Sequence, residues 1–205
     1  MTAILKVDTI QDTAGNNIIN ESSNTITIGA SGDTTNIVGT LQNNGSALSF
    51  ATVNGITEAD QWRLSADKTN VSSAEVLDSN WERNDTGFDK IGNGMSESSG
   101  VFTFPSTGIY YVSFHIMATG AGSNYISSKI SITANNSSYA ERAEAYANTS
   151  SSSDWSNASS NLFLDVTDTS NVKVRFKIDS DNSITYKGST NSNYTWANFI
   201  RLGDT

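Results

Sequence analysis

The sequence contains no cysteine, one proline and one histidine in 205 residues. The absence of cysteine excludes disulfide bridges and thiolate metal sites. The single imidazole, His115, follows an apolar run, where a structural histidine is the usual interpretation. No Gly-X-Ser-X-Gly motif accompanies it, and the pattern singles out no pair of carboxylates, so neither a serine hydrolase nor a glycosidase is indicated. We therefore expect a protein that is not an enzyme.

Basic residues are also scarce. The 12 Lys and Arg face 21 Asp and Glu, which gives a formal net charge of −9. This balance argues against binding to nucleic-acid phosphates and against adsorption to anionic lipid. No hydrophobic run is long enough to span a membrane, and residues 1–8 turn polar too early for a secretion signal. Such a chain is expected to be made in a cytoplasm and used outside it, as a virion protein is.

Hydrophobic residues make up only 36% of the chain, and Ser, Thr, Asn and Gly take the place of the missing apolar ones. The apolar residues recur in short runs separated by turn residues, which is typical of an all-β sandwich. We expect strands over residues 61–66, 75–77, 88–91, 100–104, 109–118, 125–133, 139–147, 160–166, 172–178, 184–186 and 194–202.

Residues 100–115, with the sequence GVFTFPSTGIYYVSFH, predict the central hairpin of this sandwich. Phe102 and Phe104 share one face of its first strand by the period of two. Residues 105–108 supply a tight turn, because proline presets the entry angle and glycine tolerates the exit. The second strand is apolar on both faces over residues 109–114, which indicates burial inside a sandwich or against another subunit.

This hairpin resembles the central hairpin of the C1q and tumour-necrosis-factor-like jelly-roll domains. Residues 62–66 (WRLSA) resemble the first strand of that family, and residues 184–188 (ITYKG) and 194–200 (YTWANFI) resemble its last two landmarks. The likeness covers about residues 61–202. It implies a C1q/TNF-like jelly-roll head that assembles as a homotrimer, but it names no ligand, since this scaffold carries unrelated functions.

The alanine-rich stretch 138–147 is the one place where a helix competes with a strand on local propensity. Its position in the jelly-roll order favours the strand. The residues then expected on one face are Tyr139, Glu141, Ala143, Ala145 and Ala147.

Residues 1–56 differ from the rest, and we expect a separate fibrous or anchoring segment there, before a head of residues 57–205. Phe50 is their only aromatic residue, and short aliphatic pieces alternate with turn residues in a weak ten-residue repeat. Because no such strand can bury its side chains within one chain, three copies are expected to wind about a common axis. A small β-domain or a flexible tail is the alternative. About the first 40 residues resemble the leaders of tail-fibre and related structural proteins of marine bacteriophages, which implies attachment to a virion.

Trp155 lies in a Ser- and Asn-rich stretch with nothing else apolar beside it. A flat ring framed by hydrogen-bonding side chains is a common way to bind carbohydrate or protein, and the alternative is a ring folded back onto the sheet edge. Alternate connections of an antiparallel run share an end. This places the connections 120–124, 148–157 and 180–193 at one tip, opposite those at 105–108, 134–138 and 167–171. The candidate ligand-binding residues are Trp155, Asp154, Tyr125, Asn124, Asn191 and Tyr194.

Two further groups of candidates concern subunit contacts and metal ions. The residues predicted at a trimer interface are Tyr111, Ile109, His115 and Phe199. Two acidic pairs, Asp165 with Asp168 and Asp179 with Asp181, offer carboxylates that suit Ca²⁺. Neither pair has EF-hand spacing, and Asp caps turns in any case. We expect no metal site and no cofactor, with Ca²⁺ as the alternative.

Together these features predict a structural protein of a bacteriophage virion, a trimeric fibre or appendage displayed on the particle exterior. Its N-terminal segment would bind other virion proteins, and its head would meet a glycan or protein of the host surface. Neither nucleic-acid binding nor membrane insertion is expected. One alternative is a protein that decorates or stabilises the capsid. The other is a cellular lectin-like module of the C1q type, for which a secretion leader or a collagen-like repeat would be expected, and the sequence contains neither.

Overall fold

The computed structural model describes residues 42–43, 46–47, 55–120 and 122–205. The chain divides into two compact units, residues 1–53 and residues 54–205. In the first unit, β1 (Gln42–Asn43) and β2 (Ser46–Ala47) form an antiparallel pair. Most of the fibrous segment predicted for residues 1–56, and all of the stretch of about 40 residues that resembles phage leaders, lie outside the described residues. The second unit is called the head below.

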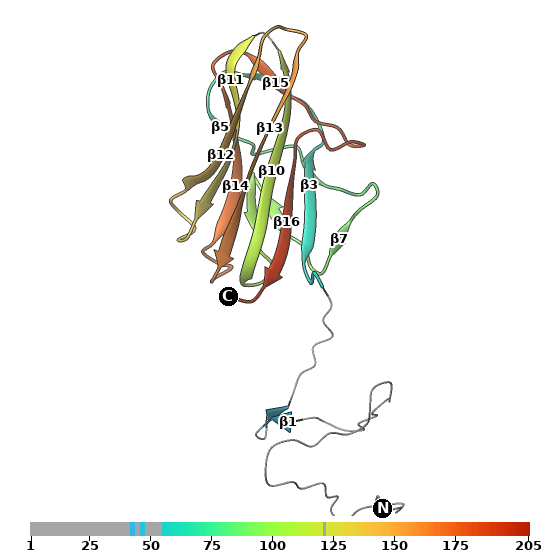
Figure 1. Ribbon diagram of the computed structural model, residues 1–205, viewed down its shortest axis with the longest axis vertical. Coiled ribbons are helices and arrows are strands. Elements are labelled where there is room, and N and C mark those ends of the chain that lie inside the picture. Colours follow the sequence, from blue (N-terminus) through green and yellow to red (C-terminus); the bar gives the residue numbers. More distant parts are fainter. Residues whose placement is uncertain (1–41, 44–45, 48–54, 121) are drawn as a thin grey trace, which may run out of the picture. The chain divides into compact units, whose positions relative to one another are not determined.

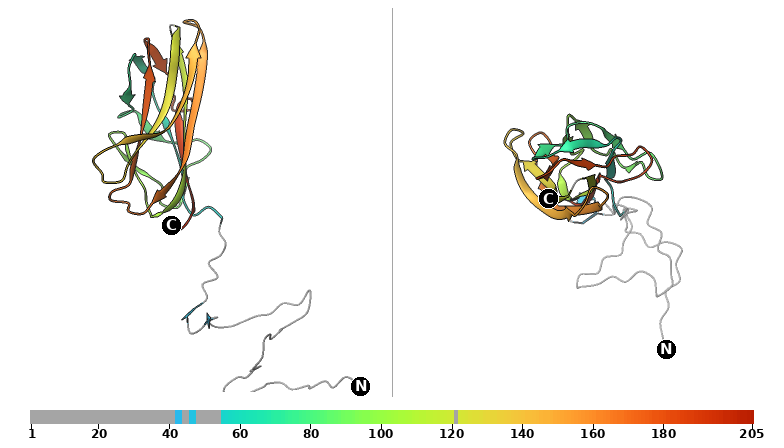
Figure 2. Two further views of the ribbon diagram at one scale, coloured as in Figure 1. Left: turned by 60° about the vertical axis from the view of Figure 1, so that its left-hand side comes forward. Right: turned by 90° about the horizontal axis from the view of Figure 1, so that it is seen from above.

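The described head consists of two antiparallel sheets that lie face to face (Figures 1 and 2). The first sheet contains β3 (Ala59–Leu64), β4 (Lys68–Val71), β6 (Trp81–Arg83), β7 (Lys90–Ile91), β10 (Gly108–Gly120), β13 (Trp155–Val166), β15 (Ile184–Tyr186) and β16 (Trp196–Gly203). The second sheet contains β5 (Glu75–Val76), β8 (Ser96–Ser98), β9 (Val101–Thr103), β11 (Ser123–Thr133), β12 (Ala140–Thr149) and β14 (Lys173–Ser180). The chain crosses between the sheets repeatedly, and this arrangement confirms the predicted jelly-roll sandwich.

Strand β10 is the centre of the first sheet. It pairs with β13 along one edge, and with β16 and then β15 along the other. β3 pairs with the outer edge of β16 so that Ala59 lies opposite Ile200. The first strand of the head therefore begins where its last strand ends, and Figure 1 shows the C-terminus at that end. We call this end the base and the opposite end the tip.

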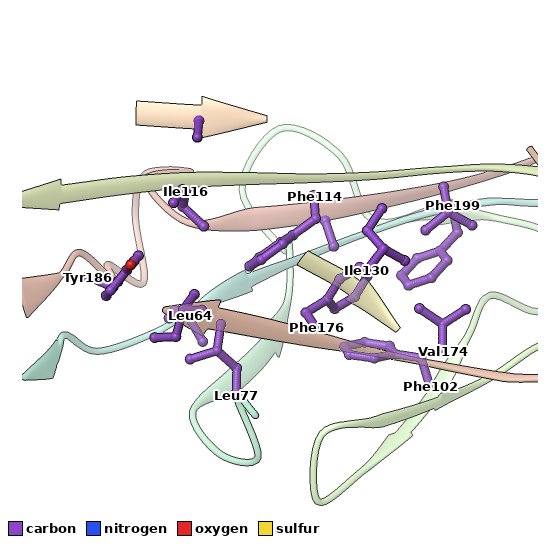
Figure 3. Packing of buried hydrophobic residues seen from close by; sticks show 14 of the residues in the cluster. Leu64, Leu77, Phe102, Phe114, Ile116, Ile130, Val174, Phe176, Tyr186 and Phe199 are labelled. Atoms are coloured by element: carbon purple, nitrogen blue, oxygen red, sulfur yellow. The ribbon is translucent and has the colours of Figure 1, made fainter. Parts of the chain in front are cut away.

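The hydrophobic core fills the space between the sheets (Figure 3). The period of two sends alternate residues of β10 inward. The side chains of β10 buried in this way are Tyr110, Val112, Phe114, Ile116 and Ala118. Four phenylalanine rings, Phe102, Phe114, Phe176 and Phe199, pack with neighbouring centroids 4.7–5.8 Å apart. They come from both sheets, so their contacts hold the two layers together.

The structure adds three short strands, β4, β6 and β8, which the apolar pattern does not indicate. Their residues are mainly polar, and pairing with neighbouring strands holds them in the sheets. β13 begins at Trp155 and not at residue 160 for the same reason, because its polar first half is paired with β10. Backbone pairing with a neighbour therefore overrides local composition at these positions.

Strand β12 forms where its position in the order predicts a strand, and the helical alternative is wrong. Ala143 and the later alanines pack against the core, but the prediction that Glu141 and Tyr139 share their face is also wrong. The register with β11 shifts between Ala143 and Glu141, as at a β-bulge. Glu141 consequently forms an ion pair with Lys177, and Tyr139 lies under the guanidinium of Arg175, 3.7 Å from it.

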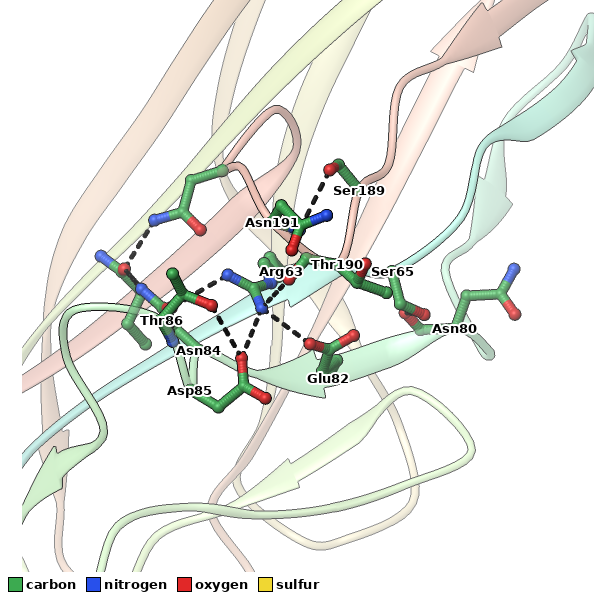
Figure 4. A network of polar contacts seen from close by, with 12 residues as sticks. Arg63, Ser65, Asn80, Glu82, Asn84, Asp85, Thr86, Ser189, Thr190 and Asn191 are labelled. Carbon is green, nitrogen blue, oxygen red and sulfur yellow. Dashed lines mark hydrogen bonds and ion pairs between the residues drawn. The ribbon is translucent and has the colours of Figure 1, made fainter.

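A buried arginine organises the flank of the first sheet (Figure 4). Arg63 on β3 is 1% exposed, and its guanidinium contacts Glu82 and Asp85 at 2.7 Å and the Asn84 side-chain oxygen at 3.0 Å. It also donates to the backbone carbonyl of Thr190. One side chain thus ties the segment after β6 and the connection between β15 and β16 to β3.

This network predicts a large effect of Arg63→Met on stability. Methionine keeps most of the apolar stem, but it leaves the partly buried Glu82 carboxylate without its donor and removes one of the two hydrogen bonds to the buried Asn84 oxygen. We expect a loss of about 3 kcal/mol in the free energy of unfolding, measured by urea denaturation. The matched control is Lys68→Met, which breaks a half-exposed 3.0 Å pair with Glu75 and should cost less than about 1 kcal/mol. Equal losses in the two variants would contradict this role of Arg63.

Candidate functional site

Three connections meet at the tip of the head. The backbone N–H of Asn124 donates to Asp181 at 3.0 Å, and the side chain of Asn182 donates to the carbonyl of Gly122 at 3.0 Å. A Cβ on Gly122 would lie 2.9 Å from the carbonyl oxygen of Ser150, so the third connection is also in contact. The predicted grouping of these connections at one end is confirmed, with the difference at residues 187–195 described below.

The connections at the base also group as predicted. The backbone N–H of Asn136 donates to the carbonyl of Asn171 at 2.9 Å, which joins the segments around residues 134–138 and 167–171. Arg201, near the end of β16, donates to the carbonyl of Thr107 at 2.9 Å and so connects the hairpin turn to the same end.

Asp154 shapes the turn that carries Trp155. Its carboxylate accepts the backbone N–H groups of Ser150 and Ser151, both at 2.8 Å, and the Ser151 hydroxyl at 2.9 Å. These bonds, first that from the Ser151 side chain and then that from the Ser150 backbone, lower the pKa of the Asp154 carboxyl. Trp155 follows as the first residue of β13 and is 62% exposed. The indole therefore does not fold back onto the sheet edge.

Asn191 and Tyr194 are not brought together with Trp155. They belong to residues 187–195, which pack against β3: the backbone N–H of Ser189 donates to the Leu64 carbonyl at 2.8 Å. The Asn193 side chain likewise donates to that of Gln61 at 2.6 Å. The prediction of a single tip connection over residues 180–193 is therefore partly wrong, because β15 divides it and only its first part stays at the tip.

Asn124 and Tyr125 lie at the tip end of β11, beside acidic residues of β14 and the turn after it. The Asn124 side chain donates to Asp181, and the Tyr125 hydroxyl lies 3.4 Å from Asp179. Asp179 and Asp181, the second of the two acidic pairs considered for Ca²⁺, therefore bind groups of the protein itself. Among the residues that the structure describes, no three His, Asp or Glu side chains converge in a way that could hold a metal ion.

The outward face of the first sheet carries three of the four residues predicted at a subunit interface. Ile109, Tyr111 and His115 are half-buried there, and Tyr111 lies 5.7 Å from the ring of Phe163, which is 72% exposed. Phe199 is a correction: it is 1% exposed and packs in the core, because its side chain points to the opposite face of the sheet. Phe163 of β13 lies on the outward face in its place.

His115 lies in a pocket of about 250 Å³ on this same face. Its Nδ1 is hydrogen-bonded to the Ser159 hydroxyl, and its ring lies 5.7 Å from that of Trp196. Burial lowers the pKa of this imidazole from its usual value. The residues that line this pocket include Ser159 but no carboxylate that could orient the imidazole.

Comparison with known proteins establishes the fold. No protein-family model and no curated protein matches the sequence. Among solved structures, murine APRIL is 13% identical, with a TM-score of 0.52 over 71% of this chain and 98% of that one. Eiger TNF from S. frugiperda is 13% identical, with a TM-score of 0.55 over 74% of this chain and 96% of that one. PRD1 vertex protein P5 is 14% identical over 73% of this chain and 100% of that one, with a TM-score of 0.46, too low for a structural argument.

The head is therefore an all-β sandwich with a TNF-like jelly-roll fold, as the hairpin at residues 100–115 predicts. At these identities the likeness concerns the fold alone. Within the described ranges, no helix is long and apolar enough to cross a membrane.

The lowered pKa of His115 predicts how stability depends on pH. Because the unfolded histidine, with a pKa of about 6.5, binds a proton more readily than the folded one, stability falls as pH drops through that value. This is the chain's only histidine. The unfolding midpoint of the wild type should be lower at pH about 5.5 than at pH about 7.5. The midpoint of His115→Gln should change less between these two pH values. The same change in both proteins would exclude His115 as the titrating group.

Proposed function

We propose that this chain is a trimeric structural protein of a bacteriophage particle, and that the tip of its head attaches to the host surface. The observation that carries the proposal is the exposed side chain of Trp155, which is 62% accessible. It lies at the tip, whereas the first strand of the head begins and its last strand ends at the base. Ala59, the first residue of β3, lies at the base, so the tip is the end of the head farthest from the point where the preceding segment joins it. The resemblance of residues 1–40 to phage tail-fibre leaders supports attachment of that segment to a virion.

The construction of the tip suits attachment. Binding residues concentrate on loops that a rigid scaffold holds in place. Here the scaffold is the closed pair of sheets, and Asp154 fixes the turn before the indole through three hydrogen bonds. A flat apolar ring among serine and asparagine side chains can pack against a sugar ring or a protein side chain while its neighbours donate and accept hydrogen bonds.

The outward face of the first sheet supports assembly of three copies. TNF-like folds typically form trimers. In this chain an apolar row crosses the sheet, because Phe163 pairs with Tyr111, Tyr111 with Ile200, and Ile200 with Ala59. A groove of about 320 Å³ with Phe88 and further apolar residues extends the row at the base. A contiguous apolar surface of this kind indicates a protein contact, and a closed ring of identical subunits would bury it three times over. Three tips on one axis would also add avidity to weak single contacts.

The trimer is tested by Phe163→Asp. An aspartate in the apolar row would be buried without a partner in the assembled protein but exposed in the separate chain. Sedimentation equilibrium of the wild type should give about three times the chain mass of 21.9 kDa. Phe163→Asp should sediment as a folded monomer. A monomeric wild type, or a variant that still forms trimers, would contradict this interface.

Attachment is tested by Trp155→Ala. Because the indole is mostly exposed, the free energy of unfolding should change by less than about 0.5 kcal/mol. Adsorption to host cells should weaken roughly tenfold or more, as expected for an aromatic residue at the centre of a contact. Ser152→Ala, in the same turn, is the matched control and should adsorb like the wild type. Unchanged adsorption of Trp155→Ala would remove the tip from attachment and favour a capsid-decorating role.

A further inference from the structure

The outward face of the second sheet is unusual because β11, the strand between β12 and β14, is covered. Ile126 and Ile130 of β11 point into the core, so Ser127, Lys129 and Ser131 point outward. Yet Ser127 is 0% and Lys129 only 7% exposed, because longer side chains of β12 and β14 lean over them. These side chains form a continuous polar and aromatic surface that runs down from the tip. We call its upper part, made of Tyr125, Lys129, Glu144, Tyr146 and Asp179, the tyrosine face.

Two tyrosines of this face are held in place by their hydroxyl groups. The Tyr146 hydroxyl donates to Glu144, and the Tyr125 hydroxyl lies 3.4 Å from Asp179. Their rings meet edge to face with centroids 6.0 Å apart and an interplanar angle of 72°. Tyr146 is nevertheless 56% exposed. Since the polar ends are occupied, the part left for a ligand is largely the apolar surface of the rings.

Lys129 joins the two carboxylates that hold these rings. Its ammonium lies 3.1 Å from Asp179 and 3.7 Å from Glu144, and 5.7 Å from the centroid of the Tyr146 ring. Burial alone would lower the pKa of this lysine, but the hydrogen bond to Asp179 and the nearby carboxylates raise it overall. The hydrogen bond to Glu144 in turn raises the pKa of Tyr146. Lys129 is therefore charged and Tyr146 neutral at physiological pH, and the arrangement is fixed before any ligand arrives.

A buried hydroxyl at the floor of this face has no partner. The Ser127 side chain lies between Tyr146 and Asp179 in the strand register, and its oxygen makes no hydrogen bond within the described part of the chain. The Ser131 oxygen, one outward position further along β11, has none either. A buried hydroxyl without a partner costs free energy. Both oxygens are covered by neighbouring side chains, so a ligand on the outer surface would contact those side chains instead.

We propose that the tyrosine face binds an uncharged saccharide of the host surface, with a pyranose ring packed on Tyr146. A pyranose has an apolar C–H face that fits an exposed aromatic ring, and hydroxyl groups at its rim that can bind to the Glu144 carboxylate, which is 35% exposed. This chemistry combines apolar packing with a few placed polar groups, as carbohydrate and other small ligands require. The proposal rests on the proposed function, because it gives that attachment a second contact and a ligand class.

The charges of this face favour an uncharged sugar over an acidic one. Lys129 is surrounded by three carboxylates, those of Asp179, Glu144 and Glu141, at 3.1, 3.7 and 3.9 Å. Lys177 pairs with Glu141, so the five charged groups sum to −1. With a net charge of −9 on the chain, a polyanionic glycan would meet repulsion.

The position of the face leaves it accessible in the assembly proposed above. Tyr146 lies on the outward side of the second sheet, whereas Phe163 and Tyr111 lie on the outward side of the first. The two surfaces are thus on opposite sides of the sandwich. Trimer formation through the first would leave the second exposed to solvent.

The proposal is tested with the full chain on immobilised oligosaccharides that end in neutral hexoses, in N-acetylhexosamines or in sialic acid. The wild type should bind at least one neutral oligosaccharide. Tyr146→Ala should weaken that binding roughly tenfold or more, while Tyr146→Phe, which keeps the ring and loses the hydroxyl, should lose only a few-fold. Leu202→Ala is the control, because Leu202 is also 56% exposed but lies at the base end of β16, and it should bind like the wild type.

Two results would overturn this inference. One is that the wild type binds no neutral oligosaccharide, or binds only the sialylated ones. The other is that Tyr146→Ala, with an unchanged unfolding midpoint, binds as well as the wild type. The inference and the proposed function fail separately: adsorption that depends on Trp155 but not on Tyr146 contradicts only the inference, and adsorption that depends on neither contradicts both.

Discussion

The packing of phenylalanine rings between the two sheets is the interaction on which the rest of the structure depends. Phe114 and Phe199 come from the first sheet, and Phe102 and Phe176 from the second, and each ring contacts rings of the opposite layer. Since strand side chains alternate between two faces, a core of this kind uses one face of each sheet. The other face of each sheet remains available, and so do the connections at both ends of the sandwich.

The two remaining faces have different chemistry, and this difference organises the proposed function. The first sheet presents an apolar row through Phe163 and Tyr111, which suits contact with other copies of the chain. The second sheet presents tyrosine rings tied to carboxylates and lysine, which suits a ligand rich in hydroxyl groups. The tip adds the exposed indole of Trp155. One core thus supports the face that we assign to assembly and the two surfaces that we propose for attachment.

The sequence predicts those parts of the fold that local pattern determines. The alternation in residues 100–115 is sufficient for the central hairpin, and the alternation of connections places all of them at the correct ends except residues 187–195. Features that depend on register are not accessible in this way. The bulge that turns Glu141 outward arises from the pairing of β12 with β11, and Phe199 lies in a strand whose two faces both carry large apolar residues. Arg63, between two apolar neighbours, has no local signal for its partners.

The tyrosine face also depends on strand register and not on local pattern. Tyr125 and Tyr146 lie on different strands, and only the pairing of Ser127 with Tyr146 brings them together. The exposure of Trp155 likewise depends on how its turn folds, which the composition of the loop leaves open. The fold was therefore more predictable than the site, because a fold needs only the apolar period whereas a site needs the positions of single side chains.

Hydroxyl-radical footprinting of the intact protein in solution tests the central claim most directly, because it reports which aromatic side chains water reaches. In the single chain Phe163, Trp155 and Tyr146 are 72%, 62% and 56% exposed. After correction for intrinsic reactivity, we expect Trp155 and Tyr146 to be labelled readily and Phe163 to be strongly protected by a neighbouring copy. Two results would contradict the assignment of the two faces. One is that Phe163 is labelled as fast as its exposure in a single chain implies, and the other is that Tyr146 is protected while Phe163 is not.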